Sequence, residues 1–182
     1  MKIIGTGSSL PQKVVTNDDL AAIMDTSDEW ISSRTGIRKR HIATTETTTS
    51  LAVEAVKAAL SDAGTDGSEI DLIIAASVTG DKIVPSLACR IQAEIGADSA
   101  VAFDINAACS GFLFALATAD AYFKTGRFHK AVILGAEVLS KIMDWNDRST
   151  CVLFGDGAGA AVVSDEGDSF KAFVQGDRKS VV

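Results

Sequence analysis

The chain has 182 residues, of which 47% are hydrophobic and 23% charged, and its formal net charge is −7. This composition is typical of a globular protein, and the acidic balance argues against nucleic acid as the main partner. No apolar run approaches the roughly 20 residues of a membrane-spanning helix, so no membrane partner is expected. The three cysteines have neither disulfide-framework nor zinc-ligand spacing. We therefore expect a cytoplasmic protein with free thiols, no metal site and no cofactor.

The N-terminal part predicts a strand over residues 2–6, with no signal peptide before it. A short helix follows, with Asn17 as its N-cap, and a second helix begins after the N-cap Ser27. The dense basic segment of the sequence covers residues 34–41. Charge runs usually lie on a solvated strand edge, but this one follows Trp30, which we expect to be exposed. An anionic ligand is therefore a second interpretation of the basic segment.

The middle and end of the chain alternate between helices and strands. Residues 51–63 have apolar positions on one helical face and end at Gly64, and residues 85–95 form another helix that ends at Gly96. The continuous apolar run over residues 70–77 predicts a strand buried on both sides. Further strands are expected over residues 131–136, 151–154 and 158–164, the last two as an antiparallel pair joined by a glycine-rich turn. This alternation predicts a single-domain α/β layered fold, with a largely parallel central sheet and helices on both faces.

The sequence around Cys109 is typical of a nucleophile between a strand and a helix. Residues 100–105 predict a short buried strand, and residues 110–124 predict a helix that is apolar around nearly its whole circumference. Small residues flank the cysteine, as in the nucleophile elbow of hydrolases: Ala107, Ala108, Ser110 and Gly111. A helix N-terminus favours the reactive thiolate. The alternative is a structural cysteine, because free cysteines are among the most buried residue types.

A glycine motif over residues 155–160 formally matches the G-x-G-x-x-A fingerprint of dinucleotide-binding proteins. That fingerprint needs a helix after the glycines to hold the pyrophosphate. Here β-branched, strand-like residues follow. We therefore interpret the glycines as positions where two backbone segments pass close together.

Five segments of the chain together resemble β-ketoacyl-acyl-carrier-protein synthase III, a family of condensing enzymes with the thiolase-like fold. They are IGTGS at 4–8, DTSDEWI at 25–31, RTGI at 34–37, AACSGF at 107–112 and FGDGAGA at 154–160. The resemblance implies a thiolase-like layered fold with a mixed central sheet. It also implies that residues 1–176 form only the N-terminal half of the usual duplicated fold. On this interpretation the C-terminal half is absent, and residues 177–182 are a non-native tail.

The resemblance also implies an activity and a set of site residues. The family condenses an acyl-CoA primer with malonyl-acyl carrier protein through a cysteine thioester, which initiates fatty acid biosynthesis, and its members are homodimers. Cys109 matches the nucleophile. The CoA-binding positions of the family are matched by Trp30, Arg34, Thr35 and Arg148. Phe154 matches an acyl-pocket position, and so does Val84, which the partner subunit contributes in family dimers.

The family completes its site with a histidine and an asparagine from the second half. Neither His41 nor His129 is expected to reach Cys109, so condensation is not expected from these 182 residues alone. Two other interpretations stay open. One is a related thiolase-superfamily synthase of a specialised metabolite, and the other is a non-catalytic nucleotide-binding or scaffold domain in which Cys109 is structural.

Overall fold

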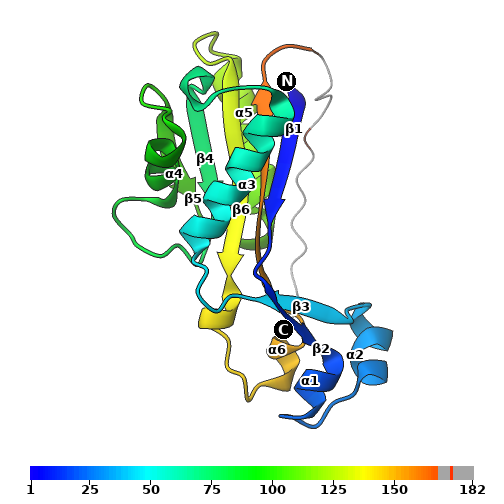
Figure 1. Cartoon of the computed structure of the whole chain (residues 1–182). Coiled ribbons are helices and arrows are strands. Elements are labelled where there is room, and N and C mark those ends of the chain that lie inside the picture. Colours follow the sequence, from blue (N-terminus) through cyan, green and yellow to red (C-terminus); the bar gives the residue numbers. More distant parts are fainter. Residues whose placement is uncertain (168–172, 174–182) are drawn as a thin grey trace.

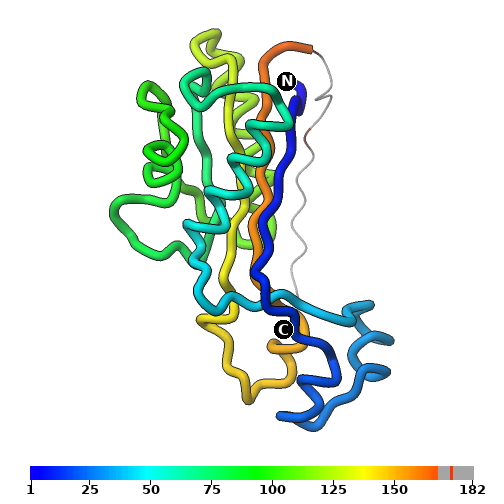
Figure 2. Tube along the Cα trace, viewed as in Figure 1, coloured from blue at the N-terminus to red at the C-terminus, as the bar shows by residue number. Residues whose placement is uncertain are grey.

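The computed structural model describes residues 1–167 and 173, and its centre is a five-stranded mixed sheet in the order β1-β7-β6-β4-β5 (Figure 1). Its strands are β1 (Lys2–Ser9), β4 (Leu72–Ala76), β5 (Val101–Ile105), β6 (Lys130–Val138) and β7 (Asp156–Ser164). β4, β5 and β6 are parallel, whereas β7 is antiparallel to both β6 and β1. Figure 2 shows β1 and β7 side by side, although they come from opposite ends of the described chain.

Helices cover both faces of this sheet, which confirms the predicted α/β layers. α3 (Thr48–Ala63) and α4 (Leu87–Ile95) pack on one face, and α5 (Gly111–Phe123) packs on the other (Figure 1). Every residue of β4 is buried, as its continuous apolar run predicts. α3 and α4 both end at left-handed glycines, Gly64 and Gly96, where the sequence predicts helix ends.

A small lobe, defined here as residues 10–42 and 143–154, lies at the carboxyl ends of the parallel strands (Figure 1). It contains the two-stranded sheet of β2 (Lys13–Thr16) and β3 (Lys39–Ile42), with α1 (Asn17–Ala21), α2 (Asp28–Thr35) and α6 (Arg148–Cys151). The buried centre of the lobe consists of Leu20, Ile31, Cys151 and Val152. Short 3-10 turns elsewhere are η1 (Gly67–Glu69), η2 (Ala108–Ser110) and η3 (Leu139–Lys141).

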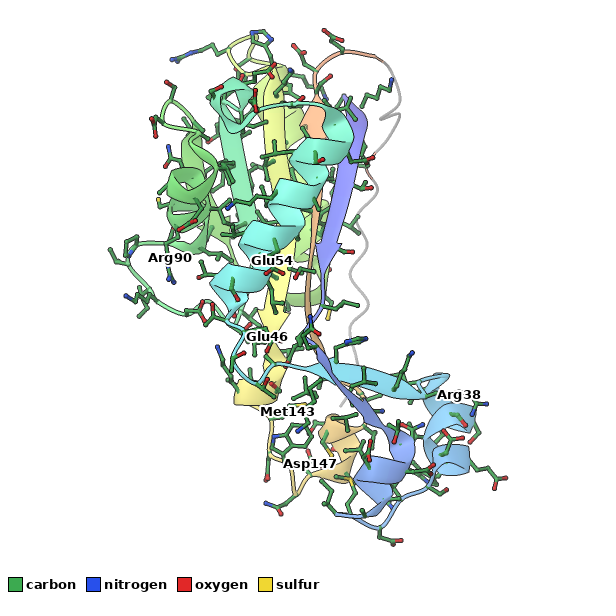
Figure 3. The ribbon with its side chains drawn as sticks, viewed as in Figure 1. Arg38, Glu46, Glu54, Arg90, Met143 and Asp147 are labelled. Atoms are coloured by element: carbon green, nitrogen blue, oxygen red, sulfur yellow. The ribbon has the colours of Figure 1, made fainter. Side chains whose placement is uncertain are left out.

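Glu46 joins the two chain segments that lead into the small lobe, and Figure 3 shows it at that junction. Its carboxylate accepts hydrogen bonds from the backbone N–H groups of Gln12 at 2.9 Å and Thr44 at 2.9 Å. These N–H groups, that of Gln12 above all, lower the pKa of Glu46 to about 2. The carboxylate therefore stays ionised and continues to accept these hydrogen bonds over the physiological pH range.

The interpretation of the basic segment as a solvated strand edge is wrong for Arg40. Its side chain is buried, and it donates to the side-chain oxygen of Asn17 at 2.8 Å and to the carbonyl of Val152 at 3.2 Å. Asn17 is also not the N-cap of α1, because its side chain bonds within the lobe. Thr16 takes that role and accepts from the N–H of Asp19. Arg40 therefore holds the lobe together from the inside.

The prediction of a strand over residues 151–154 and a glycine turn after it is also wrong. Cys151 ends α6, and the glycines lie next to and inside β7. An added Cβ at Gly155 would lie 3.1 Å from the Cβ of Arg40, and one at Gly157 would lie 2.8 Å from a methyl of Leu10. Close packing thus explains these two glycines, as the sequence predicts, and a strand follows them instead of a nucleotide-binding helix.

Two segments predicted to be buried are partly exposed. β5 is an edge strand of the described sheet, which leaves Val101 44% exposed. α5 packs against the sheet on one side only, so Leu113 is 55% and Phe114 38% exposed. Residues 177–182, predicted to be a non-native tail, lie outside the described residues. Within residues 1–167, none of the helices has the length and hydrophobicity that crossing a bilayer would require.

Candidate functional site

The parallel strands β4, β5 and β6 end at the same edge of the sheet, and Cys109 lies in the turn that follows β5. The chain leaves β5 at Ile105, forms the 3-10 turn η2 and enters α5 at Gly111, as the nucleophile-elbow pattern predicts. Gly111 is needed because an added Cβ would lie 2.8 Å from the Cβ of Ala76. Ala108 has a φ of 45°, which is uncommon for a residue with a side chain. The turn is therefore tight, and it presents Cys109 at the strand ends.

Cys109 opens into a cavity of about 370 Å³, a size within the range of small-molecule sites, roughly 300–1,000 Å³. The walls come from the residue after β1, the ends of β4, β6 and β7, the turn and the start of α5. They are Leu10, Ala76, Ala108, Phe112, Gly135, Ala136, Glu137, Gly157, Ala158 and Gly159. A second cavity of about 430 Å³, lined by residues such as Val14, Leu20 and Trp145, lies in the small lobe and has no cysteine, serine or threonine in its lining. The cavity at Cys109 is the better candidate because it combines a nucleophile with a largely apolar wall.

Glu137 is a site residue that the sequence reasoning missed. It follows the predicted strand 131–136, and its carboxylate accepts from the N–H of Val78 at 2.8 Å and from the hydroxyl of Thr79. The hydroxyl oxygen of Thr79 accepts in turn from the N–H of Val138 at 2.8 Å. Glu137 therefore fixes the segment that leaves β4 beside the cavity. The sequence could have indicated Glu137 by its position, because it follows a predicted parallel strand, and ligands often bind at the carboxyl ends of such strands.

The three thiols differ in exposure in the way a reactive Cys109 requires. Cys109 is exposed, Cys89 is half-buried with its sulfur 3.8 Å from the carbonyl of Ala102, and Cys151 is buried. Burial raises the pKa of the Cys151 thiol. Since the thiolate is the nucleophile, a buried thiol with a raised pKa reacts slowly.

We expect iodoacetamide to alkylate Cys109 first in the folded protein, with Cys89 slower and Cys151 unreactive until unfolding. Peptide mapping after short incubations measures this order. A urea-unfolded sample, in which all three thiols should react, is the control. Faster alkylation of Cys89 or Cys151 in the folded protein would contradict the assignment of Cys109.

Trp30, Arg34 and Arg148 form one cationic–aromatic cluster on the small lobe. The guanidinium carbons of Arg34 and Arg148 lie 4.4 Å and 4.7 Å from the centroid of the Trp30 ring. Arg148 also donates to the carbonyl of Asp25 at 2.7 Å. Asp147, the N-cap of the helix that begins at Arg148, lies with that helix in the lower part of Figure 3. The fold thus brings together three of the four residues predicted to bind CoA.

The other predicted site residues lie apart from these groups. The hydroxyl of Thr35 donates to the carbonyl of Ile31 at 2.7 Å and so is used within its own helix. Val84 is 81% exposed on the loop before α4, and Phe154 is 37% exposed after α6. Neither of these two side chains lines the cavity at Cys109.

Both histidines have hydrogen-bond partners that are not part of the cavity wall. The Nδ1 of His41 lies 2.7 Å from the carbonyl oxygen of Pro11, and that of His129 lies 2.7 Å from a carboxylate oxygen of Asp165. The hydrogen bond to Asp165 raises the pKa of His129. Neither histidine lines the cavity, which agrees with the expectation that neither acts as a base for Cys109.

Comparison with known proteins gives consistent matches. A family profile described as 3-oxoacyl-[acyl-carrier-protein (ACP)] synthase III matches residues 103–178. The β-ketoacyl-[acyl-carrier-protein] synthase III of Clostridium acetobutylicum is 53% identical over 179 residues, which is 97% of this chain and 55% of that protein. The crystal structure of 3-oxoacyl-[acyl-carrier-protein] synthase III from Aquifex aeolicus is 55% identical with a TM-score of 0.89, over 92% of this chain and 54% of that one.

A further solved structure, the priming β-ketosynthase from the R1128 polyketide biosynthetic pathway, is 41% identical with a TM-score of 0.87. It covers 90% of this chain and 49% of that one. The chain thus spans about half the length of the relatives it matches. These matches and the layered mixed sheet confirm the predicted thiolase-like fold. The chain is thus similar to β-ketoacyl-acyl-carrier-protein synthase III proteins over about half of their length.

Proposed function

We propose that this chain is the acyl-accepting half of a β-ketoacyl-acyl-carrier-protein synthase III, which condenses an acyl-CoA primer with malonyl-acyl carrier protein and so initiates fatty acid biosynthesis. The observation that supports this most is the exposed Cys109 in a tight turn between β5 and α5, open to a largely apolar cavity. A free thiol at the start of a helix is a good nucleophile and, as a thiolate, a good leaving group. Both properties are needed for a thioester intermediate.

In the first step the Cys109 thiolate attacks the carbonyl carbon of the acyl-CoA. A sulfur–carbon bond forms, the bond from that carbon to the CoA sulfur breaks, and the CoA thiolate takes up a proton. The backbone N–H of Cys109 is the donor that we assign to the transient oxyanion. The product is an acyl thioester on Cys109.

In the second step malonyl-acyl carrier protein loses CO₂, and the resulting carbanion forms a carbon–carbon bond to the carbonyl carbon of the Cys109 thioester. The bond from that carbon to the Cys109 sulfur breaks, and Cys109 leaves as the free thiolate. The family uses a histidine and an asparagine of its second half for this step. Neither His41 nor His129 lines the cavity. The 182 residues alone should therefore form the acyl-enzyme but not the condensation product, whereas the full-length homodimer should do both.

We assign the adenine of the acyl-CoA substrate to the cluster of Trp30, Arg34 and Arg148. Thr35 is assigned to the same CoA-binding site. Guanidinium and indole groups both stack on aromatic bases. To fit between Trp30 and Arg148, an adenine ring requires these two groups to be separated by about twice the 3.5 Å of one carbon–carbon contact. Because Arg148 lies 4.7 Å from the ring centroid, it has to move outward when CoA binds. Val84 and Phe154 keep their proposed place in the acyl pocket of the full-length dimer.

Incubation of the chain with acetyl-CoA or butyryl-CoA tests the proposal. Intact-protein mass spectrometry should reveal one added acyl group, which neutral hydroxylamine removes because it is a thioester. The matched control is the same incubation with free acetate or butyrate plus CoA. A chain whose Cys109 reacts with iodoacetamide but with neither acyl-CoA would contradict the proposal and would favour a non-catalytic domain.

A second candidate is the priming synthase of a polyketide or another specialised metabolite. The similarity to the R1128 priming β-ketosynthase favours it. Both candidates use the same cysteine chemistry, and the carrier protein that supplies the malonyl group distinguishes them. Comparing condensation rates of the full-length protein with fatty-acid and polyketide carrier proteins separates them.

Replacement of Trp30 by alanine is expected to weaken acyl-CoA binding by about 1–3 kcal/mol, the value of one base–aromatic stack. Arg148→Lys should also weaken binding, because an ammonium group does not stack as a guanidinium does. Isothermal titration of the chain with CoA measures both. Arg38→Lys is the control, since Arg38 belongs to the same basic segment but pairs with Asp28 at 2.8 Å. Unchanged affinity in both test variants would refute the CoA assignment.

A further inference from the structure

The cavity beside Cys109 has two glycines in its wall that packing within the described chain does not explain. Gly135 of β6 and Gly159 of β7 are direct partners in the antiparallel register, and both line the cavity. Neither has a positive φ, so the backbone conformation does not require glycine. A glycine inside a strand weakens the strand, and it often marks a place where a ligand or another backbone approaches closely.

Contacts within the described residues account for two neighbouring glycines, but not for Gly135 and Gly159. An added Cβ would lie 2.8 Å from the Cβ of Ala76 at Gly111 and 2.8 Å from a methyl of Leu10 at Gly157, so neighbouring atoms would have to shift to admit a larger residue. At Gly135 and Gly159 an added Cβ would meet no atom of residues 1–167 within 4 Å. The space above the pair is open, and it belongs to the cavity that Cys109 also lines.

The strand register shows on which face of the sheet this open space lies. Side chains alternate along a strand, so Gly135 faces the same side as Ile133, and Gly159 the same side as Ala161. Ile133 and Ala161 pack in the cluster beneath α5. The glycine pair therefore continues the α5-facing surface of the sheet to its edge, where the turn with Cys109 begins.

The chemistry of the cavity wall suits an apolar group. The ionisable carboxylate in the wall, Glu137, already accepts hydrogen bonds from the N–H of Val78 and the hydroxyl of Thr79. The remaining wall consists mainly of alanine, glycine, leucine and phenylalanine. Such a surface binds hydrocarbon through its buried area and leaves no polar group without a partner.

We propose that Gly135 and Gly159 form the surface on which the acyl chain of the Cys109 thioester lies, and that their missing side chains set the size of the acyl group accepted. This inference rests on the proposed function, since it assigns the tail of the substrate whose carbonyl Cys109 attacks. An alanine at either position would add a methyl group to the path of the chain. Short acyl groups would then be favoured over longer ones.

The test uses iodoacetamides whose nitrogen carries an ethyl or a hexyl group. The Cys109 thiolate displaces iodide in forming the sulfur–carbon bond, so the reaction needs neither CoA recognition nor any part of the proposed reaction. Labelling rates of Cys109 are measured by peptide mass spectrometry in the wild type, Gly135→Ala and Gly159→Ala. We expect the hexyl-to-ethyl rate ratio to fall tenfold or more in both variants, since one methyl group in an apolar pocket discriminates by about 10- to 200-fold.

Gly80→Ala is the matched control. It lies outside the cavity, and the nearest atom to an added Cβ is the carbonyl oxygen of Lys82 at 3.8 Å. The rate ratio should stay at the wild-type value in this variant. Equal ratios in the wild type and both test variants would overturn the proposal and would mean that another part of the protein covers the pair. An equal fall in Gly80→Ala would also overturn it, because the effect would not be local.

A second measurement keeps the proposal testable if either variant fails to fold. Wild-type protein is alkylated at Cys109 with a hexyl iodoacetamide that ends in a diazirine, and the adduct is irradiated. Cross-links to residues 135–137 or 157–159 would support the proposal. Cross-links confined to other segments, or to solvent alone, would overturn it. If the labelling ratios and the cross-links both support the glycine pair while acyl-CoA fails to acylate Cys109, the proposed function is wrong. The site for an alkyl chain beside Cys109 is then still supported.

Discussion

Replacing Cys109 with alanine is expected to abolish transfer of an acyl group from acyl-CoA to the chain. The loss should exceed about 10³-fold, as for removal of a nucleophile in other covalent enzymes. Cys89 cannot replace it, because it is half-buried and outside the cavity, and Cys151 is buried with a raised pKa. The measurement is intact-protein mass spectrometry after incubation with butyryl-CoA.

Two further variants make this result specific. Cys109→Ser keeps the shape of the side chain, but its hydroxyl stays protonated near neutral pH, so we expect a large loss here as well. Cys89→Ala should acylate at the wild-type rate, since Cys89 lies in α4 and makes no part of the cavity. Acylation that survives in Cys109→Ala, or that disappears in Cys89→Ala, would place the nucleophile elsewhere.

Replacing Arg40 with leucine is expected to lower the free energy of unfolding by about 2–4 kcal/mol. Arg40 donates to the side-chain oxygen of Asn17 and to the carbonyls of Val15 and Val152. Leucine fills most of the space but leaves these acceptors without a donor, and each buried unsatisfied group costs roughly 1–3 kcal/mol. Arg40→Lys should recover only part of the loss, because an ammonium lacks the planar fork of a guanidinium.

Urea unfolding followed by tryptophan fluorescence measures this effect. Both tryptophans, Trp30 and Trp145, pack on the buried centre of the small lobe, so their emission reports on the part that Arg40 holds. Lys39→Leu is the control: it is exposed on the same strand and should change stability by less than about 0.5 kcal/mol. Equal unfolding midpoints for Arg40→Leu and Lys39→Leu would show that the buried hydrogen bonds do not stabilise the lobe.

The elements with strong local signals could be predicted from the sequence. α3 has its N-cap at Thr47, an apolar face and a left-handed Gly64 at its end, and these signals act within a few residues of one another. The strand over β4 was equally clear because a continuous apolar run is typical of a strand buried on both faces. The turn with Cys109 belongs to the same group, since small residues between a strand and a helix permit a sharp change of direction.

The predictions that were wrong concern residues whose contacts come from distant parts of the sequence. Arg40 looks like a surface charge until the fold brings Val152 to its side chain. The strand predicted over residues 158–164 is confirmed, but β7 begins two residues earlier, at Asp156. Asp156 and Gly157 gain their strand partners from β6, and the sequence around a glycine does not indicate such pairing. Propensity describes a residue and its close neighbours, whereas a strand also needs partners across the sheet.

The sequence by itself determined the layered α/β fold, the place of Cys109 in a tight turn between a strand and a helix, and the absence of a nucleotide-binding helix after the glycines. Each of these depends on patterns of apolar and small residues within one segment. Only the tertiary structure decided that Arg34 and Arg148 meet on Trp30, that Glu137 borders the cavity, and that Gly135 lies opposite Gly159. These facts depend on strand order and register. Order and register follow from how all the buried surfaces pack together, so no single segment carries them.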